Sequence, residues 1–154
     1  MIFSRASKNA TVILLLFTAL APGLVEAKAF CLVSRMADKT ESHPVAVGDA
    51  LTLTFLHSIY GSPVEERFRI DPEGLKTSEL RYAELRLVEF YGHESAKLKE
   101  GWWVVKNPGR ALQSLSLSAS RESFIDITFR DQMIRLHGGE ARLSLTACDR
   151  RTSG

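Results

Sequence analysis

Two stretches of the chain alternate between apolar and polar residues, and this period of two constrains the fold more than any other feature. In residues 51–58, one face of an extended chain carries Leu51, Leu53, Phe55 and His57. In residues 64–70, one face carries Val64, Glu66, Phe68 and Ile70. Such alternation is typical of β-strands with one buried face. A tight turn at Tyr60–Gly61 between them predicts a β-hairpin.

The rest of the chain has the same character, with short apolar or alternating segments separated by turn residues. Residues 83–91 fit both a strand and a helix, and their good helix formers favour a short helix. Further strands are expected at 30–34, 75–82, 102–106, 112–119, 124–130, 132–136 and 141–148, with a polar loop over 38–44. The prediction is an all-β fold, a small antiparallel sandwich or barrel of about eight or nine strands with one short helix.

The C-terminal segments predict a meander. A turn at Arg130–Asp131 places Ile127 opposite Ile134 and Ile125 opposite Leu136. A second turn at Gly138–Gly139 would then place Leu136 opposite Ala141 and Ile134 opposite Leu143. Both pairings match apolar residues with apolar residues, as one buried face requires.

The N-terminus has the layout of a secretory signal. Residues 1–10 carry Arg5 and Lys8 and no acid, and an apolar run over 11–20 ends before Pro22–Gly23. Val25–Glu26–Ala27 offers short residues to a signal peptidase, so cleavage is expected after Ala27, with Ala29 as a second position. The alternative is an uncleaved N-terminal anchor. We therefore expect a signal peptide over 1–27 and a single exported β domain over 28–154.

The charge balance argues against nucleic acid as a partner. The chain has 20 Lys and Arg and 18 Asp and Glu, and the signal peptide holds Arg5, Lys8 and Glu26. The exported part therefore carries 18 basic and 17 acidic side chains. A surface so close to neutral has no long-range attraction for phosphate backbones.

Two cysteines, Cys31 and Cys148, lie near the two ends of the exported part. An oxidising compartment favours a disulfide between them, which would join the first strand to the last. The competing interpretations are a redox pair, although the local spacing of redox pairs is missing, and two free buried thiols.

One polar cluster stands out on the apolar face of the first hairpin. The expected register sets Phe55 opposite Glu66, which leaves His57 diagonal to Glu66. Buried ionisable groups must bond to each other, to another polar group or to a ligand. Candidate ligand-binding residues are His57, Glu66, the turn residues Ser58 and Tyr60, and Arg81 as a partner for an anion, with Ser62 as a further hydroxyl.

Three interpretations of this cluster remain open. The first is a small ligand pocket, and the second is a bonded His57–Glu66 pair that only fixes strand register. The third is a hydrolase that uses His57, Glu66 and a hydroxyl. His93 and Glu94 have no spacing typical of metal ligands, and the chain lacks a phosphate-binding glycine loop and a G-x-S-x-G elbow. No cofactor and no metal is expected, and the sequence leaves enzyme activity open.

The segment His57–Glu66, followed by Arg81–Tyr82 and by Glu89–Gly92, resembles the bacterial family called domain of unknown function 1850. The resemblance covers roughly residues 47–146 and marks His57, Ser58, Pro63 and Glu66 as matching its motif. Members of that family are often encoded beside, or fused to, TRAP transporters of the TAXI type, which take up organic acids. The resemblance implies a periplasmic accessory protein of solute uptake. Its implied partners are a TRAP membrane subunit, the periplasmic binding protein of such a system, or a small organic acid.

Overall fold

The computed structural model describes residues 30–37, 39–106 and 109–148. The expected signal peptide over 1–27 and both expected cleavage positions lie outside the described residues. The elements are β1 (Phe30–Met36), β2 (Lys39–Val45), β3 (Ala50–Leu56), β4 (Pro63–Asp71), β5 (Gly74–Tyr82), α1 (Leu85–Phe90), β6 (Lys97–Lys99), β7 (Trp102–Lys106), β8 (Ala111–Leu112), β9 (Ser114–Phe129) and β10 (Gln132–Ala147). No helix in these ranges has the length and apolar character to cross a membrane.

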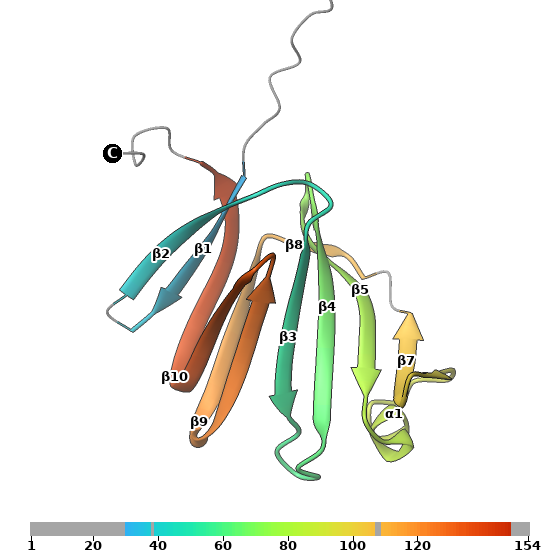
Figure 1. The fold of residues 1–154 in the computed structure, drawn as a ribbon. Helices are drawn as coiled ribbons and strands as arrows, with labels where there is room; N and C mark the ends of the chain where they lie inside the picture. The colour runs from blue at the N-terminus through green and yellow to red at the C-terminus, as the bar shows by residue number, and fades with distance from the viewer. Residues whose placement is uncertain (1–29, 38, 107–108, 149–154) are drawn as a thin grey trace, which may run out of the picture.

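The ten strands of the described residues form one antiparallel sheet (Figure 1). Its order is β2-β1-β10-β9-β3-β4-β5-β7-β6, and β8 pairs with β5 beside this path. The all-β prediction is confirmed, and so is the short helix, as α1. The strand count exceeds the expected eight or nine because β2, β6 and β8 are additional, while β9 and β10 each combine two expected strands.

The segment expected as a polar loop over 38–44 is largely strand β2. It pairs with β1 along its whole length and forms one edge of the sheet. Edge strands tolerate charged residues and proline because one side of their backbone stays unpaired. Because Lys39, Glu41 and Pro44 interrupt the alternation of apolar and polar residues, the sequence pattern did not predict this strand.

The sheet folds over at the β9–β10 hairpin, and both strands bend sharply there (Figure 1). At the bend, His137 pairs with Phe124 and Gly139 pairs with Ala119, so four residues of β9 lie against Gly138 alone. Gly138 has a φ of 67° and Gly139 a φ of 83°, a backbone region that favours glycine. The expected turn at Gly138–Gly139 is therefore wrong: these glycines form a corner within β10.

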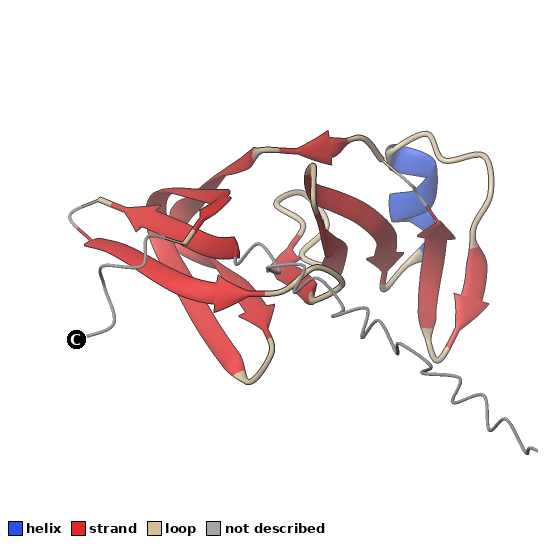
Figure 2. Ribbon diagram, turned by 90° about the horizontal axis from the view of Figure 1, so that it is seen from above, coloured by secondary structure: helices blue, strands red, loops and turns tan. Residues whose placement is uncertain are grey.

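Folding over gives the continuous, open sheet two layers (Figures 1 and 2). One layer contains β1, β2, the second half of β10 and the first half of β9. The other contains the remaining halves of β9 and β10 with β3, β4, β5, β7 and β6. The main core lies between them and includes Phe30, Leu32, Val45 and Leu143 from the first layer and Leu51, Leu53, Phe68, Ile70, Leu75, Ile127 and Phe129 from the second.

The observed β9–β10 register agrees with the expected one up to the corner and differs beyond it. The expected pairs Ile127–Ile134 and Ile125–Leu136 are confirmed. Beyond the corner, Ala141 pairs with Leu117 and Leu143 with Leu115, so the pairs expected for Ala141 and Leu143 are wrong.

The β3–β4 hairpin is shifted by two residues from the expected register: Phe55 pairs with Val64 and Leu53 with Glu66. The turn is longer than the Tyr60–Gly61 turn that the sequence suggested. His57 N–H donates to the Ser62 carbonyl at 2.9 Å, and Gly61 N–H donates to the His57 carbonyl at 2.8 Å. Four residues, 58–61, therefore form the loop, and Glu66 is displaced from the position diagonal to His57.

The expected disulfide is present between Cys31 and Cys148. The two Cα atoms are 4.9 Å apart, and 117 positions separate the residues in sequence. Cys31 lies in β1 and Cys148 follows the last residue of β10, so the bond joins neighbouring strands at the two ends of the described chain.

Candidate functional site

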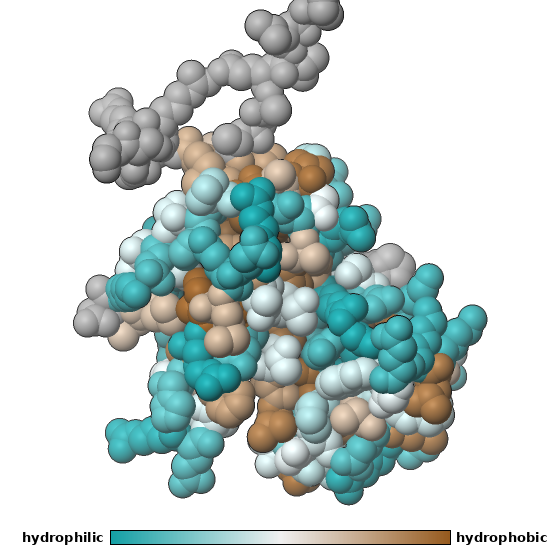
Figure 3. Space-filling model, in the orientation of Figure 1, coloured by the Kyte–Doolittle hydropathy of each residue, from teal (hydrophilic) through white to brown (hydrophobic). Residues whose placement is uncertain are grey.

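A cavity of about 710 Å³ opens between the two layers, at the end of the molecule where the β3–β4 turn and the bend of β9 lie. Figure 3 shows apolar surface among polar side chains at this lower end. The cavity is lined by Leu53, Phe55, Leu56, His57, Ser58, Gly61, Glu66, Tyr91, Leu115, Ser116, Leu117, Ser118, Ser120, Glu122, Ser123, Phe124 and Ile125. About half of its lining residues are polar and the rest are mostly apolar, so a ligand there would meet both kinds of surface.

His57 borders the cavity from the end of β3 and is only 6% exposed. Its Nδ1 accepts the backbone N–H groups of Ile59 at 3.3 Å and Tyr60 at 3.4 Å. The proton of the neutral ring is therefore on Nε2. Nε2 has no hydrogen-bond partner among the described residues, so an N–H donor remains available at the cavity.

Aromatic rings hold the imidazole in place. Tyr60 stacks on His57 with ring centroids 5.2 Å apart. Phe90 and Tyr91, at the end of α1, meet it edge to face at 4.9 and 5.6 Å. The short helix α1, which begins at Leu85 soon after β5 ends, thus brings two rings against the β3–β4 turn.

Glu66 lies half-buried on the cavity face of β4, between Leu53 of β3 and Leu80 of β5. Its carboxyl group makes no hydrogen bond or ion pair with any residue that the structure describes. Desolvation by burial raises the pKa of its carboxyl above the ordinary value of 4.5. Glu66 and His57 thus line one cavity without bonding to each other.

Of the three hydroxyl-bearing residues expected near His57, one lines the cavity and two are engaged by other residues of the protein. Ser58 is exposed and lines the cavity, whereas Tyr60 stacks on His57 and carries the Arg86 guanidinium on its ring at 4.6 Å. Ser62 is buried and hydrogen-bonds to the Glu84 carboxylate. Of the turn hydroxyls, only that of Ser58 is placed to contact a ligand in the cavity.

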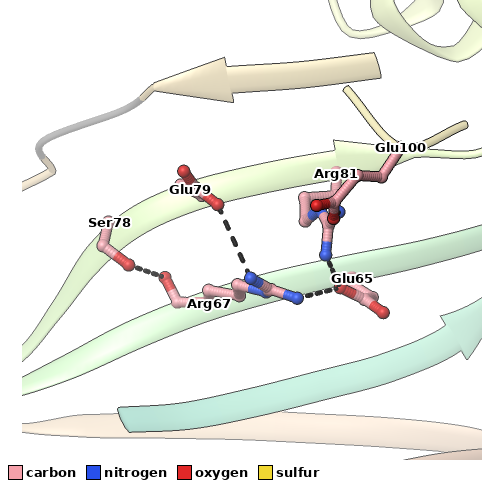
Figure 4. A network of polar contacts seen from close by, with 6 residues as sticks. All are labelled: Glu65, Arg67, Ser78, Glu79, Arg81 and Glu100. Atoms are coloured by element: carbon pink, nitrogen blue, oxygen red, sulfur yellow. Dashed lines mark hydrogen bonds and ion pairs between the residues drawn. The ribbon is translucent and has the colours of Figure 1, made fainter. Parts of the chain in front are cut away.

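Arg81 does not line the cavity: it pairs with Glu65 and so lies on the face of the sheet opposite to Glu66. Figure 4 shows it beside the Glu65 carboxylate. It is 8% exposed, and its guanidinium bonds to the Glu65 carboxylate at 3.1 Å and lies 3.8 Å from that of Glu100. The Trp102 ring lies below it at 5.3 Å. Its anion partners are therefore supplied by the protein itself.

Sequence reasoning missed the wall that β9 contributes. The segment from Ser114 to Ser123 contains five serines. Four of them, Ser116, Ser118, Ser120 and Ser123, line the cavity, and Ser116 and Ser118 flank the apolar Leu117. The bend brings Ser120, Glu122 and Ser123 to its mouth. A serine-rich stretch, followed further along the chain by the double glycine Gly138–Gly139, was the available signal, because small residues permit a sharp corner.

The arrangement differs from a catalytic triad. In a triad, Nδ1–H of the histidine donates to the carboxylate that orients it. Here Nδ1 accepts from the backbone, and the carboxyl of Glu66 is not bonded to the ring. Within the described ranges, no three His, Cys, Asp or Glu side chains are grouped so that they would hold a metal ion.

A family model described as Domain of unknown function (DUF1850) matches residues 51–136, more than half of the chain. The chain belongs to this family. The DUF1850 match runs from β3 into β10 and contains every described residue that lines the cavity. The disulfide and strands β1 and β2 lie outside it. No curated protein and no solved structure matches the chain.

Proposed function

We propose that this DUF1850 protein is a periplasmic accessory protein of TRAP-type solute uptake that binds a small ligand in the cavity between its two layers. The periplasmic assignment rests on the signal-like N-terminus and is supported by the disulfide. The link to TRAP transporters rests on the association of the family with them. The binding function rests on the cavity.

One observation carries the binding function: two hydrogen-bonding groups face the cavity with no partner among the described residues. They are Nε2–H of His57 and the carboxyl group of Glu66. Leaving a half-buried polar group unpaired costs stability, and most such groups in proteins are bonded. A ligand that bonds to both groups would remove this cost.

The purely structural interpretation is less well supported, because a pair that fixes strand register has to be bonded, and His57 and Glu66 are not. The hydrolase interpretation lacks the orienting bond of a triad. The ligand-binding interpretation requires neither feature. It also accounts for the apolar residues that line the cavity beside the two unpaired groups.

Exposed apolar residues on the two elements next to the cavity support contact with a transporter component. Ile59 is 69% exposed, Phe90 is 49% exposed, and Leu56, Leu85 and Tyr91 are exposed as well. These residues belong to the β3–β4 hairpin and to α1 with its C-cap. Exposed apolar groups gathered at a ligand site are typical of protein contact surfaces.

Affinity capture tests the TRAP association. A tagged full-length chain is expressed, recovered from the periplasm and the solubilised membrane, and its partners are quantified by mass spectrometry. TRAP membrane subunits or their binding protein should be enriched with the wild type and depleted with Ile59→Asp/Phe90→Asp. The matched control is Glu89→Gln, an exposed position on the same helix outside the cavity. Equal recovery of TRAP subunits with all three proteins and with an empty tag would overturn the association.

A further inference from the structure

The cavity has a marked charge bias. Its described lining contains two carboxyl groups, those of Glu66 and Glu122, and no lysine or arginine. Inside a partly enclosed cavity, electrostatic effects are stronger than on an open surface. The lining therefore attracts a positive group and repels a carboxylate.

Aromatic faces lie next to the inner carboxyl group. Tyr91 and His57 line the cavity together with Glu66. The rings of His57, Phe90 and Tyr91 meet one another edge to face, at 4.9, 5.3 and 5.6 Å. Aromatic rings beside a carboxylate are the groups with which proteins bind ammonium ions, through the ring quadrupole and a charge-assisted hydrogen bond.

The rest of the wall suits an apolar ligand body. Leu53 and Phe55 from β3 and Ile125, which pairs with Phe55, line the cavity from one layer, and Leu115 and Leu117 from the first half of β9 line it from the other. All except Leu53 are only partly buried by the protein itself. A ligand that covers them gains burial of apolar surface.

We propose that the cavity binds an organic amine, whose ammonium group pairs with the carboxylate of Glu66 beside Tyr91 and whose apolar body packs between β3 and the first half of β9. This inference rests on the proposed ligand-binding function and specifies the class of ligand. It differs from the small organic acid that the family resemblance implies, for which the cavity offers only Nε2–H of His57 and hydroxyl groups.

Three probes with one apolar body separate the possibilities: 4-phenylbutylamine, 4-phenylbutanoate and 4-phenylbutanol. Each is titrated by calorimetry at pH 7.5 into protein that was expressed as the full-length chain and purified from the periplasm. The amine should bind at least about tenfold more tightly than the acid or the alcohol, the ratio expected of one charge-assisted hydrogen bond. Glu66→Gln should remove this advantage, and Tyr91→Leu should weaken amine binding by about threefold.

Glu89→Gln changes charge by the same amount outside the cavity and should leave amine binding unchanged. Glu66→Gln removes an unpaired charge, so its melting temperature should be at least that of the wild type. Such a result shows that the variant loses amine binding without losing its fold. Tighter binding of 4-phenylbutanoate overturns the amine inference and leaves ligand binding intact. Binding of none of the probes at 5 mM, about the weakest affinity of interest, overturns the inference together with the ligand-binding part of the proposed function.

Discussion

His57 and Glu66 line one cavity from neighbouring strands, yet the imidazole is oriented by the backbone of its own turn and not by the carboxylate. The turn therefore fixes the ring whether or not Glu66 is charged. Substitutions at the two residues therefore test different features. Those of His57 test the turn and its aromatic packing, and those of Glu66 test the cavity.

Glu66→Gln should stabilise the protein at neutral pH. Burial raises the pKa of Glu66 above 4.5, so the folded state binds this proton more tightly than the unfolded state does. The resulting stabilisation is fully present below pH 4.5 and is lost as the pH rises through the raised pKa. At pH 7.5, the variant should exceed the wild type by about 1 kcal/mol in free energy of unfolding.

Urea denaturation of both proteins between pH 4 and pH 8 measures this difference. It should be small at the acid end and largest at the alkaline end. Tyr82 and Tyr91 also interact electrostatically with Glu66, but burial raises the pKa values of both phenols, so neither titrates in this range. A difference that stays constant with pH would contradict the assignment to Glu66.

His57→Ala should lower the free energy of unfolding by about 2 kcal/mol, because it removes a buried ring and the acceptor of two backbone N–H groups. His57→Asn should recover part of this loss, since an asparagine side chain also accepts backbone N–H groups in a turn. Chemical denaturation of the three proteins checks the order. Equal stability of the alanine and asparagine variants would show that the turn bonds contribute nothing.

Arg81→Met should destabilise the fold without affecting the cavity. The substitution removes a buried guanidinium that pairs with Glu65, at a cost of about 2 kcal/mol. Amine titration of the variant should give the wild-type affinity. Arg69→Met, at an exposed position on β4, is the matched control for stability. A selective loss of ligand binding in Arg81→Met would place Arg81 in the site after all.

Replacing both cysteines, as Cys31→Ala/Cys148→Ala, should lower the free energy of unfolding by on the order of 4 kcal/mol, because the bond closes a very long loop in the unfolded chain. Thermal melts with and without reductant check this prediction. The wild type should lose stability on reduction and the double variant should not. If reductant left the melting temperature of the wild type unchanged, strand pairing alone would hold β1 against β10.

The strands that carry local signals were predictable, and so was the pairing of the cysteines. Alternation located β3 and β4, and an oxidising compartment suggested the disulfide. The shared face of His57 and Glu66 also follows from alternation, since a two-residue shift of register keeps every side chain on its own face. The exact partners depended on the loop length, which the sequence does not determine.

The displacement of Arg81 has a single local cause. Ser78 is an extra residue in β5: Arg67 pairs with Glu79 and Phe68 pairs with Thr77. Without this bulge, Arg81 would pair with Val64 and share the face of Glu66. With it, Arg81 pairs with Glu65 on the other face. The Ser78 hydroxyl donates to the Arg67 carbonyl at 3.1 Å. The sequence around Ser78 contains no pattern that predicts a bulge.

The β9 wall required knowledge of how the layers fold over. Ser120 and Glu122 line the same cavity as His57 only because the corner at Gly138 turns both long strands. The two segments that line the cavity together are about 60 residues apart in sequence, and the periodicity of a single segment does not predict such an arrangement.

The position of the disulfide also decides how the domain responds to mechanical force. Cys31 and Cys148 are covalently joined next to the two ends of the described chain. Tension applied at both ends passes directly through the sulfur–sulfur bond, and the 116 residues between the cysteines carry none of it. While the bond is intact, the sheet and its cavity keep their shape under load; once it is reduced, the same pull would separate β1 from β10 first.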